Sequence, residues 1–439
     1  MTIAATLLVY GFVMVMGWLA LTVLVASRAR HAETRTRTAV WLILAVACAA
    51  RVGVLLTTEP LLSDDIWRYI DDGQQLAAGR NPYAHSPQHR LDQGIPTDSA
   101  IARRVNHPSL VTIYQPTSQW VFAATYTAAQ AAGLTDHPAH WAARDASRVY
   151  RLAFSLFDLW LIAMLLLKLL RDGRSPWLAT LYAWHPLVIT EVAWSGHQDV
   201  IGIAWLMMAL LLVDARGLFD PAGESMGRGL RRAVLAGGAM ALAIGVKPIV
   251  APIALALCWH QRRQPRRLAV AAVTCGATLG LLYAPFVFMP GGIDGMRQTI
   301  SAFVNTWSFN SPVHEPMTAL LGSRRAADVL LAGAAVGAML FVTFRRDDPY
   351  RASLVYLFAA LLLSSTVHPW YLLWALAFVP LRFSAAVWVF SLTIAFSYEV
   401  LMHAETWATP RWVMIAEYAP VALVLLAGPL LRLRRTRFA

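Results

Sequence analysis

Stretches of about 20 apolar residues recur along the whole chain, and they limit its possible folds more than any other feature. A stretch of this length can cross the hydrocarbon core of a bilayer as a helix. Helices are required there because the backbone polar groups must be satisfied within the segment itself. Only 14% of the 439 residues are charged, against about 25% in soluble proteins. The sequence therefore predicts an all-α polytopic membrane protein.

We expect about 13 membrane-spanning helices within a single integral membrane domain that covers residues 1–439. The expected spans are 5–26, 39–57, 148–170, 175–191, 200–215, 233–246, 249–260, 268–288, 327–344, 353–367, 370–381, 384–402 and 413–430. The three cysteines fall in apolar segments at unrelated spacings, a pattern that predicts neither a metal motif nor a disulfide.

Arginines gather in short loops between these spans, and cytoplasmic loops are the ones enriched in such residues. The net charge of +12 thus indicates orientation in a membrane rather than binding of nucleic acid. The N-terminus is then outside and the C-terminus inside, which requires an odd number of crossings. The basic clusters expected in the cytoplasm lie at 28–37, 168–174, 228–232, 262–267, 345–351 and 432–437.

Two segments need a separate interpretation. Residues 117–131 are apolar, but a crossing there would place Arg171 and Arg174 outside. We therefore expect an interfacial or re-entrant helix on the outer side. The segment 233–260 has arginines at both ends, so it must cross twice, and the proline after Lys247 is the natural break.

With this topology, nearly all residues capable of chemistry lie on the outer side. The first outer loop, about 58–147, begins with Asp64 and Asp65 just past an apolar span. Carboxylates near a membrane are costly and are usually functional. Other candidates in this loop are Arg68, Tyr69, Asn81, His107 and Tyr114, and further outer turns carry His197, Asp199, Lys247, His368, Trp370 and Tyr371.

Several short runs in this set, taken together and in order, resemble motifs of bacterial glycosyltransferases of the C superfamily. The matching runs are Asp64-Asp65-Ile66-Trp67-Arg68-Tyr69, Gly79-Arg80-Asn81-Pro82-Tyr83, Asn106-His107-Pro108, Ser195-Gly196-His197-Gln198-Asp199 and Val367-His368-Pro369-Trp370-Tyr371-Leu372. Enzymes of this family take sugars, often mannose, from polyprenyl-phosphate donors. Asp71-Asp72-Gly73 and Gln115-Pro116 depart from the family's usual Trp-Asp-Gly and Pro-Pro, which bears on the subfamily and the acceptor.

The resemblance implies an inverting transfer of a sugar, with Asp64 as the base that deprotonates the acceptor hydroxyl. A carboxylate suits that role at neutral pH. Asp65 would orient the acceptor or help to bind a divalent cation, the only cofactor considered. Lys247, His368 and Arg68 would bind the donor phosphate, since a leaving phosphate needs cations around it. The remaining candidates, Tyr69, Asn81, His107, Tyr114, His197, Asp199, Trp370 and Tyr371, would bind substrate.

The implied partners are a polyprenyl-phosphate sugar, an acceptor hydroxyl on a lipid or glycan, and membrane lipids, with no nucleic acid. The implied location is the bacterial cytoplasmic membrane, with the site facing the periplasm. A transporter or flippase of lipid-linked sugar is the alternative. Transporters usually contain repeats and mid-membrane charges, whereas this chain has no visible repeat and its polar residues lie on one side. A structural membrane protein would not need ordered Asp, Lys and His motifs on that side.

Most of these residues also have a purely structural interpretation. Aspartates such as Asp64, Asp65 and Asp199 can cap helices, and Lys247 can extend toward the membrane surface. Arg68 can pair with Asp64 or Asp72 at helical spacing. His368 can be a hydrogen-bonded structural residue, and aromatic residues near span ends are typical interface anchors.

Overall fold

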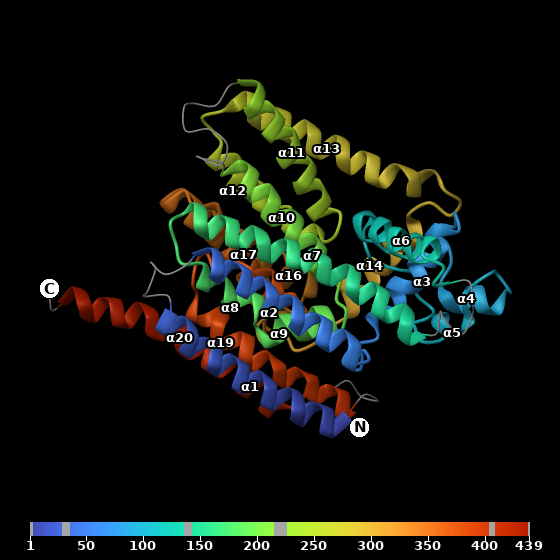
Figure 1. The fold of residues 1–439 in the computed structure, drawn as a ribbon, viewed down its shortest axis with the longest axis horizontal. Helices are drawn as coiled ribbons and strands as arrows, with labels where there is room; N and C mark the ends of the chain where they lie inside the picture. The colour runs from blue at the N-terminus through green and yellow to red at the C-terminus, as the bar shows by residue number, and fades with distance from the viewer. Residues whose placement is uncertain (1–2, 29–35, 136–142, 215–225, 404–408, 438–439) are drawn as a thin grey trace. The chain divides into compact units, whose positions relative to one another are not determined.

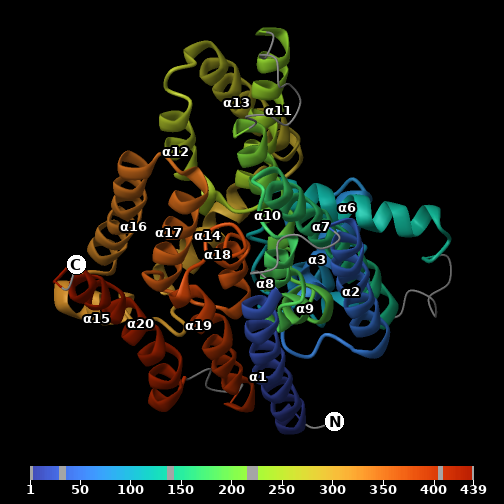
Figure 2. The same ribbon diagram turned by 60° about the vertical axis from the view of Figure 1, so that its left-hand side comes forward.

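The computed structural model describes residues 3–28, 36–135, 143–214, 226–403 and 409–437, and in this part of the chain the regular structure is helical (Figure 1, Figure 2). One isolated bridge between Phe309 and Thr366 is the exception. The predicted all-α class is confirmed for these residues. The loop at 29–35, which carries part of the first predicted basic cluster, lies outside them.

The chain divides into two compact units, each built from segments that are far apart in sequence. Unit 1 contains residues 1–43, 173–188 and 307–439, and unit 2 contains 44–172 and 189–306. The helices of unit 2 are the greater part of α2 (Thr36–Thr57), α3 (Asp65–Ala77), α4 (Pro87–Asp92), α5 (Ser99–Ala102), α6 (Pro116–Ala131), α7 (Ala143–Arg171), the π-helical turn η2 (Thr190–Trp194), α10 (Asp199–Val213), α11 (Met226–Ile244), η3 (Pro248–Val250), α12 (Ile253–His260), α13 (Pro265–Phe288) and α14 (Asp294–Thr306).

Glycines allow the helices of unit 2 to pack closely. A Cβ on Gly73 would lie 2.1 Å from the Tyr150 hydroxyl oxygen and 2.6 Å from the Phe122 carbonyl oxygen, so α3, α6 and α7 meet at this residue. A Cβ on Gly237 would lie 2.3 Å from the Ala271 carbonyl oxygen, where α11 and α13 run side by side (Figure 1, Figure 2). Small residues serve this purpose at helix contacts in membranes.

A buried ion pair also joins two helices of unit 2. Nε of Arg51 on α2 lies 2.5 Å from Oδ2 of Asp158 on α7, and both side chains are inaccessible to solvent. Because an isolated buried charge is very costly, each of these residues requires the other. The pair fixes α2 against α7 just before the predicted outer loop.

Unit 1 contains the remaining helices. They are α1 (Ile3–Arg28), η1 (Pro176–Ala179), α8 (Thr180–Ala183), most of α9 (Pro186–Ile189), α15 (His314–Leu321), α16 (Arg324–Arg346), α17 (Pro349–Leu362), η4 (Pro369–Leu372), α18 (Leu373–Leu376), α19 (Ala385–Thr393), η5 (Ile394–His403) and α20 (Arg411–Arg437). Helix α1 packs on α19, where Trp18 stacks on Trp388 with ring centroids 5.4 Å apart.

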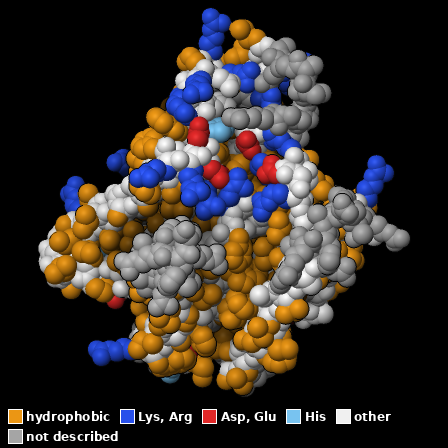
Figure 3. Space-filling view, turned by 90° about the vertical axis from the view of Figure 1, so that its left-hand side faces the viewer, with side chains coloured by type: hydrophobic (Ala, Val, Ile, Leu, Met, Phe, Trp, Pro, Cys, Tyr) orange, Lys and Arg blue, Asp and Glu red, His pale blue; other side chains and the backbone are white. Residues whose placement is uncertain are grey.

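Many large apolar side chains point outward, as expected of helices that face lipid. Leu8 is 76% exposed, Trp41 is 71% exposed and Leu281 is 75% exposed. Hydrophobic side chains also cover much of the face drawn in Figure 3. Six helices of the described chain are long and apolar enough to cross a membrane, or seven if one bent pair counts as a span. The chain is therefore a membrane protein, although the predicted count of 13 crossings is not confirmed.

Breaks in several expected spans account for part of the difference in count, and other expected spans, such as α17, are shorter than the membrane requires. The segment expected to span at 175–191 is divided among η1, α8 and α9. Pro186 lacks an amide hydrogen, and the Leu187 amide instead donates to Nδ1 of His185 at 3.1 Å. The segment 370–381 likewise contains only η4 and α18, with a bend after Leu376. Short apolar pieces of this kind resemble spans in composition but lack their continuous helix.

Two other expectations about helices are confirmed. Residues 116–131 form the helix α6, although its interfacial position stays a prediction. The segment 233–260 breaks after Ile244 and resumes at Pro248, with Lys247 between the two pieces. The Gly245 carbonyl accepts from the Thr117 amide at 2.9 Å, which brings the two backbones close together. Glycine is required at this position because a Cβ would lie 2.3 Å from Oγ1 of Thr117.

Candidate active site

The paired aspartates lie at the start of α3 and differ in their surroundings. Asp64 precedes the helix, is exposed, and makes no capping hydrogen bond with its side chain. Asp65 is held on both sides, because Nδ2 of Asn106 donates to Oδ1 at 2.8 Å and the Tyr114 hydroxyl donates to Oδ2 at 2.9 Å. Asp64 therefore occupies the N-cap position of α3 without the side-chain hydrogen bond that a capping aspartate usually makes.

Asp64 is exposed as a residue, but protein partly surrounds its carboxyl group, and loss of solvent raises the pKa of both carboxyls. For Asp65 the loss of solvent is the main cause, and the hydrogen bonds from Asn106 and Tyr114 partly oppose it. For Asp64 the loss of solvent and the neighbouring charge of Asp65 raise the pKa, while hydrogen bonding to the Trp67 side chain and the charge of Arg104 lower it. A carboxyl with a raised pKa is a better proton acceptor once it is ionised.

Arg68 is buried, and its guanidinium is used by the protein itself. It donates to the carbonyl oxygens of Leu110 at 2.9 Å, Asn106 at 2.8 Å and His107 at 3.0 Å. These bonds hold a turn in which His107 adopts a positive φ of 46°. Arg68 thus anchors the segment that carries Asn106, and its predicted contact with phosphate remains untested.

Other predicted substrate residues of the first loop have internal partners as well. Tyr69 is buried, and its ring contacts the rings of Tyr114 and Phe122, each with centroids 4.8 Å away. His107 is exposed as a residue, but its imidazole is partly shielded from solvent. This shielding and the charge of Arg68 both lower the pKa of His107. Of these residues, His107 is the one best placed to reach a ligand.

Asn81 joins this loop to the end of α13. Its Nδ2 donates to the carbonyl oxygens of Pro290 at 3.1 Å and Gly292 at 2.8 Å. The next motif residue, Tyr83, is buried and donates its hydroxyl to the Tyr114 carbonyl at 2.7 Å. The Asn-Pro-Tyr run therefore links the first loop to the segment between α13 and α14. The helices of the first loop, α3, α4, α5 and α6, lie together at one end of unit 2 (Figure 1).

Lys247 forms an ion pair with Asp199. Its Nζ lies 2.7 Å from Oδ1 of Asp199, the first residue of α10. Burial lowers the pKa of Lys247, and the nearby charges of Asp199 and Asp65 oppose that change. The charge of Asp199 in turn raises the pKa of Asp65. Asp65, Asp199 and Lys247, predicted from separate outer segments, therefore lie in one electrostatic neighbourhood.

The sequence analysis missed Glu191, which is fully buried beside His197. The two side chains approach to 3.4 Å, and the His197 amide donates to the Glu191 carbonyl at 2.8 Å. Glu191 lies in the π-helical turn η2, a form that often occurs at functional sites. An acid within an apolar run is itself a functional signal, so this residue could have been found from the sequence.

His368, Trp370 and Tyr371 belong to unit 1. The imidazole of His368 is stacked between Phe309, at a centroid distance of 4.7 Å, and Trp370, at 4.3 Å, and Tyr371 meets it edge-on at 5.3 Å. These stacked rings restrict the directions from which a ligand can reach the imidazole. Since Lys247 belongs to unit 2, the predicted common phosphate site of Lys247 and His368 stays a prediction.

Buried polar contacts fix the segment that stacks on His368. Nδ2 of Asn310 donates to Oε2 of Glu417 at 2.6 Å, and the Tyr418 hydroxyl donates to the Asn310 carbonyl at 2.8 Å. The Phe309 amide donates to Ser365 at 3.0 Å. Asn310 has a positive φ of 51°, a conformation that asparagine tolerates better than most residues. Glu417 on α20 thereby positions Phe309.

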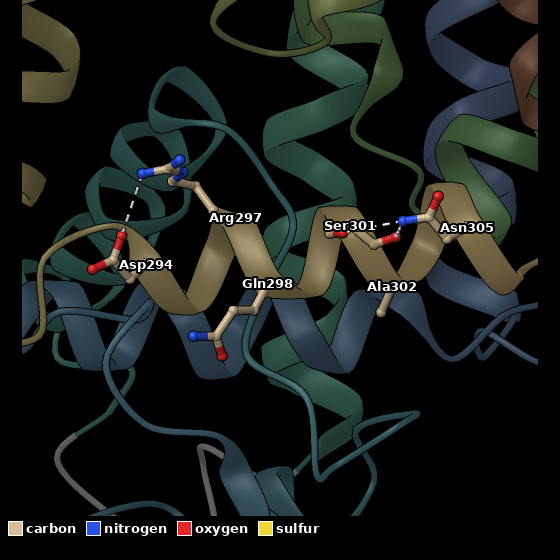
Figure 4. Close-up of a pocket in the computed structure, with 6 residues that line it drawn as sticks. All are labelled: Asp294, Arg297, Gln298, Ser301, Ala302 and Asn305. Atoms are coloured by element: carbon tan, nitrogen blue, oxygen red, sulfur yellow. Dashed lines mark hydrogen bonds and ion pairs between the residues drawn. The ribbon is translucent and has the colours of Figure 1, made fainter. Parts of the chain in front are cut away.

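A surface cavity of about 700 Å³ lies along the polar side of α14 (Figure 4). Asp294 and Arg297 are 3.6 Å apart in it, and Asn305 donates to Ser301. The opposite side of α14 is apolar, and Met296 packs there against Tyr83. None of the predicted site residues lines this cavity.

The described residues contain no group of three or more His, Cys, Asp or Glu side chains that could hold a metal ion. A divalent cation at Asp64 and Asp65 would therefore need further ligands from the substrate, for example phosphate oxygens.

The fold defines a helical membrane protein, and its candidate site contains two adjacent aspartates at the start of α3. Residues 1–262 match the family model described as "Alpha-(1->6)-mannopyranosyltransferase, N-terminal domain", and residues 299–430 match the "MptB C-terminal domain" model. The chain therefore belongs to the alpha-(1->6)-mannopyranosyltransferase family. This result confirms the resemblance to C-superfamily glycosyltransferases.

One curated relative supports the same assignment. The chain is 27% identical over 435 residues to "Alpha-(1->6)-mannopyranosyltransferase B" of Corynebacterium glutamicum, and the match covers 89% of this chain and 67% of the relative. No solved structure matches the chain.

Proposed function

We propose that the protein transfers mannose, with inversion, from a polyprenyl-phosphate donor to a hydroxyl of a lipid- or glycan-linked acceptor. The reaction would take place on the outer face of the bacterial cytoplasmic membrane. Membership of a mannosyltransferase family supports mannose as the sugar, and the name of the relative suggests an α-(1→6) linkage in the product.

The observation that carries the proposal is the contrast between Asp64 and Asp65. Asp64 is exposed and its side chain makes no capping hydrogen bond, whereas both carboxylate oxygens of Asp65 accept hydrogen bonds. Asp64 accepts the proton of the acceptor hydroxyl while that oxygen attacks the anomeric carbon. The new C–O bond forms as the bond to the phosphate oxygen breaks, and polyprenyl phosphate leaves. A β-linked donor then gives an α-linked product.

The other predicted residues have supporting roles in this proposal. Asp65 orients the acceptor side of the site through Asn106 and Tyr114. Lys247 exchanges its contact with Asp199 for one with the donor phosphate, and His368 donates to the same phosphate from the edge of its ring. A doubly substituted phosphate accepts such charge-assisted bonds from more than one direction. Asp199, His197, Trp370 and Tyr371 contact the sugar or the acceptor.

The purified full-length protein in lipid nanodiscs tests the proposal. It is supplied with radiolabelled polyprenyl-phosphate mannose or polyprenyl-phosphate glucose and a bacterial lipid extract. We expect label from mannose in a product that an α-(1→6)-specific mannosidase releases, and no product from Asp64→Asn. Transfer from a nucleotide-activated mannose in place of the lipid donor would contradict the proposal.

A double-mutant cycle tests the common phosphate site. Lys247→Gln and His368→Asn should each raise the donor KM, and the double variant should show a smaller effect than the product of the two changes, because neighbouring contacts to one group are coupled. Lys168→Gln is the matched control, since Lys168 pairs with Asp172 and Asp214 at the predicted cytoplasmic side. If the effects of the two substitutions on the donor KM simply multiplied, Lys247 and His368 would not bind the same phosphate.

A further inference from the structure

The cationic side chains of the first loop and of the apex between α11 and η3 differ in whether they already donate hydrogen bonds to the protein. Four of those in the first loop and at the apex of α11 and η3 donate to protein acceptors. They are Arg68 with three carbonyls, Arg80 with Gln75, Arg90 with Asp71, and Lys247 with Asp199. Arg103 and Arg104 make no side-chain hydrogen bond or ion pair with any described residue, and both are exposed.

Of these two arginines, Arg104 stacks on Trp67, which follows the proposed base Asp64 by three residues. Its Cζ lies 5.0 Å from the centroid of the Trp67 ring. Trp67 is in the first turn of α3, and its amide donates to the Asp64 carbonyl at 3.1 Å. A guanidinium on a tryptophan face is held in place by attraction to the ring, while its N–H edges stay available.

The segment that carries Arg104 is anchored on both sides. Ile101 and Ala102 in α5 are buried just before it, and Arg68 binds the carbonyls of Asn106 and His107 just after it. Arg104 is thus presented by a fixed backbone rather than by a loose loop. Fixed donors bind a ligand with little loss of conformational entropy.

We propose that Arg104 binds the phosphate of the lipid-phosphate donor, an inference that rests on the function proposed above. The guanidinium is planar, weakly hydrated and matched to two phosphate oxygens at once. The charge of Arg104 already acts on Asp64, but its N–H groups make no hydrogen bond with a described residue, and a leaving phosphate next to two carboxylates needs such a cationic donor more than neutral sugar hydroxyls do. The charge that develops on that phosphate is where a positioned donor contributes most.

An ordinary surface stack is the competing explanation, and the chain offers a control for it. Arg345 lies 5.1 Å from the Phe341 ring, one turn away on the same helix α16. That contact needs no ligand because neighbouring turns bring the two side chains together. Arg104, in the turn after α5, and Trp67, in the first turn of α3, come instead from separate segments.

The test measures binding of polyprenyl phosphate, without sugar, to the full-length protein in nanodiscs, alongside transfer kinetics. Arg104→Gln should weaken binding by about 10- to 100-fold, the usual worth of a hydrogen bond to a charged group, and raise the donor KM similarly. Arg103→Gln removes the same charge from the same segment and should stay within about two-fold. Arg345→Gln should behave like the wild type.

Several outcomes would overturn the inference. Unchanged binding by Arg104→Gln is one, and equal weakening by Arg103→Gln is another, because it would indicate general charge attraction. If Arg104→Gln shifted the acidic limb of the pH–rate profile but left the donor affinity unchanged, Arg104 would act only on the pKa of Asp64. Competition by phosphatidylglycerol as strong as that by polyprenyl phosphate would assign Arg104 to bulk lipid headgroups.

The two proposals fail in different ways. If the wild type binds polyprenyl phosphate through Arg104 but transfers no sugar from any donor, the proposed function is wrong and the phosphate contact stands. If the wild type transfers mannose and Arg104→Gln binds the donor normally, only the role of Arg104 is wrong.

Discussion

Nδ2 of Asn106 lies 2.8 Å from Oδ1 of Asp65, although 41 residues separate them in the chain. The Tyr114 hydroxyl donates to the other carboxylate oxygen, Oδ2, at 2.9 Å. These two bonds fix the orientation of Asp65 and close the first loop onto the start of α3. Asp64, the adjacent residue, is exposed and makes no capping hydrogen bond with its side chain. Two neighbouring aspartates of similar sequence context therefore have different structural roles.

This difference predicts unequal effects of the matched variants. Asp64→Asn keeps the shape of the side chain but removes the base, and it should lower turnover by about 10² to 10⁴, the usual worth of a positioned acid or base. Because the pKa of Asp64 is raised, wild-type activity should fall with decreasing pH at a point above the ordinary aspartate value of about 3.9. Asp65→Asn should cost less turnover.

The same assay can reverse this assignment. Near-normal turnover of Asp64→Asn with an inactive Asp65→Asn would make Asp65 the base. Activity in both variants would mean that the pair is structural. Melting temperature and donor binding serve as controls, since both variants should fold normally.

Arg68→Gln should act on stability more than on donor affinity. The substitution removes a buried guanidinium that donates to three carbonyls, and we expect a loss of about 3 kcal/mol with a clear drop in melting temperature. Arg80→Gln, which loses a single side-chain bond to Gln75, is the matched control with a smaller effect. A normal melting temperature with a raised donor KM would instead assign Arg68 to the phosphate.

Asp72 should make folding stability depend on pH. Burial raises its pKa to about 6, so the folded protein keeps this proton to a higher pH than the unfolded chain does. Its contribution to stability is therefore largest below about pH 4 and is lost as pH rises to about 6, a change of about 3 kcal/mol. Thermal unfolding in detergent between pH 4 and 8 measures it.

Asp72→Asn should flatten that profile and stabilise the protein at pH 7 to 8, because Gln119, now 2.9 Å from Oδ2, can still donate to the amide oxygen. Asp71→Asn should destabilise it at the same pH, since Asp71 pairs with buried Arg90. Identical profiles for the wild type and Asp72→Asn would refute this account.

The positive-inside topology can be tested by labelling in whole cells. In a variant without Cys48, Cys258 and Cys275, a cysteine at Gln264 should react with a membrane-impermeant maleimide only after permeabilisation. A cysteine at Gln88, an exposed residue of α4, should react in intact cells. Labelling of position 264 from outside would overturn the predicted topology.

Glu417 should influence His368 without contacting the donor. Glu417→Ala removes the acceptor for Asn310 and should loosen Phe309, which stacks on His368, so we expect a higher donor KM. Glu417→Gln keeps an acceptor oxygen and should be close to the wild type. Equal effects of the two variants would point to a requirement for charge rather than for position.

The sequence alone determined the helical membrane class, the break at Lys247, the helix at 117–131 and the family motifs. These features depend on local information, namely apolar length, a proline after Lys247 and runs of adjacent residues. It did not determine the number of continuous spans, because the broken segment at 175–191 has the composition of a span while its backbone follows contacts around Pro186.

Only the tertiary structure decided which partner each polar residue has. Arg68 could reach Asp64 or Asp72 at helical spacing, yet it binds carbonyls of a distant turn. Lys247 meets Asp199 across 48 residues of sequence, and Arg104 meets Trp67 from another segment. The sequence shows where each charge lies along a helix. The partner of that charge depends on which groups the packing of several helices brings within a few ångströms. Those distances are properties of the whole fold.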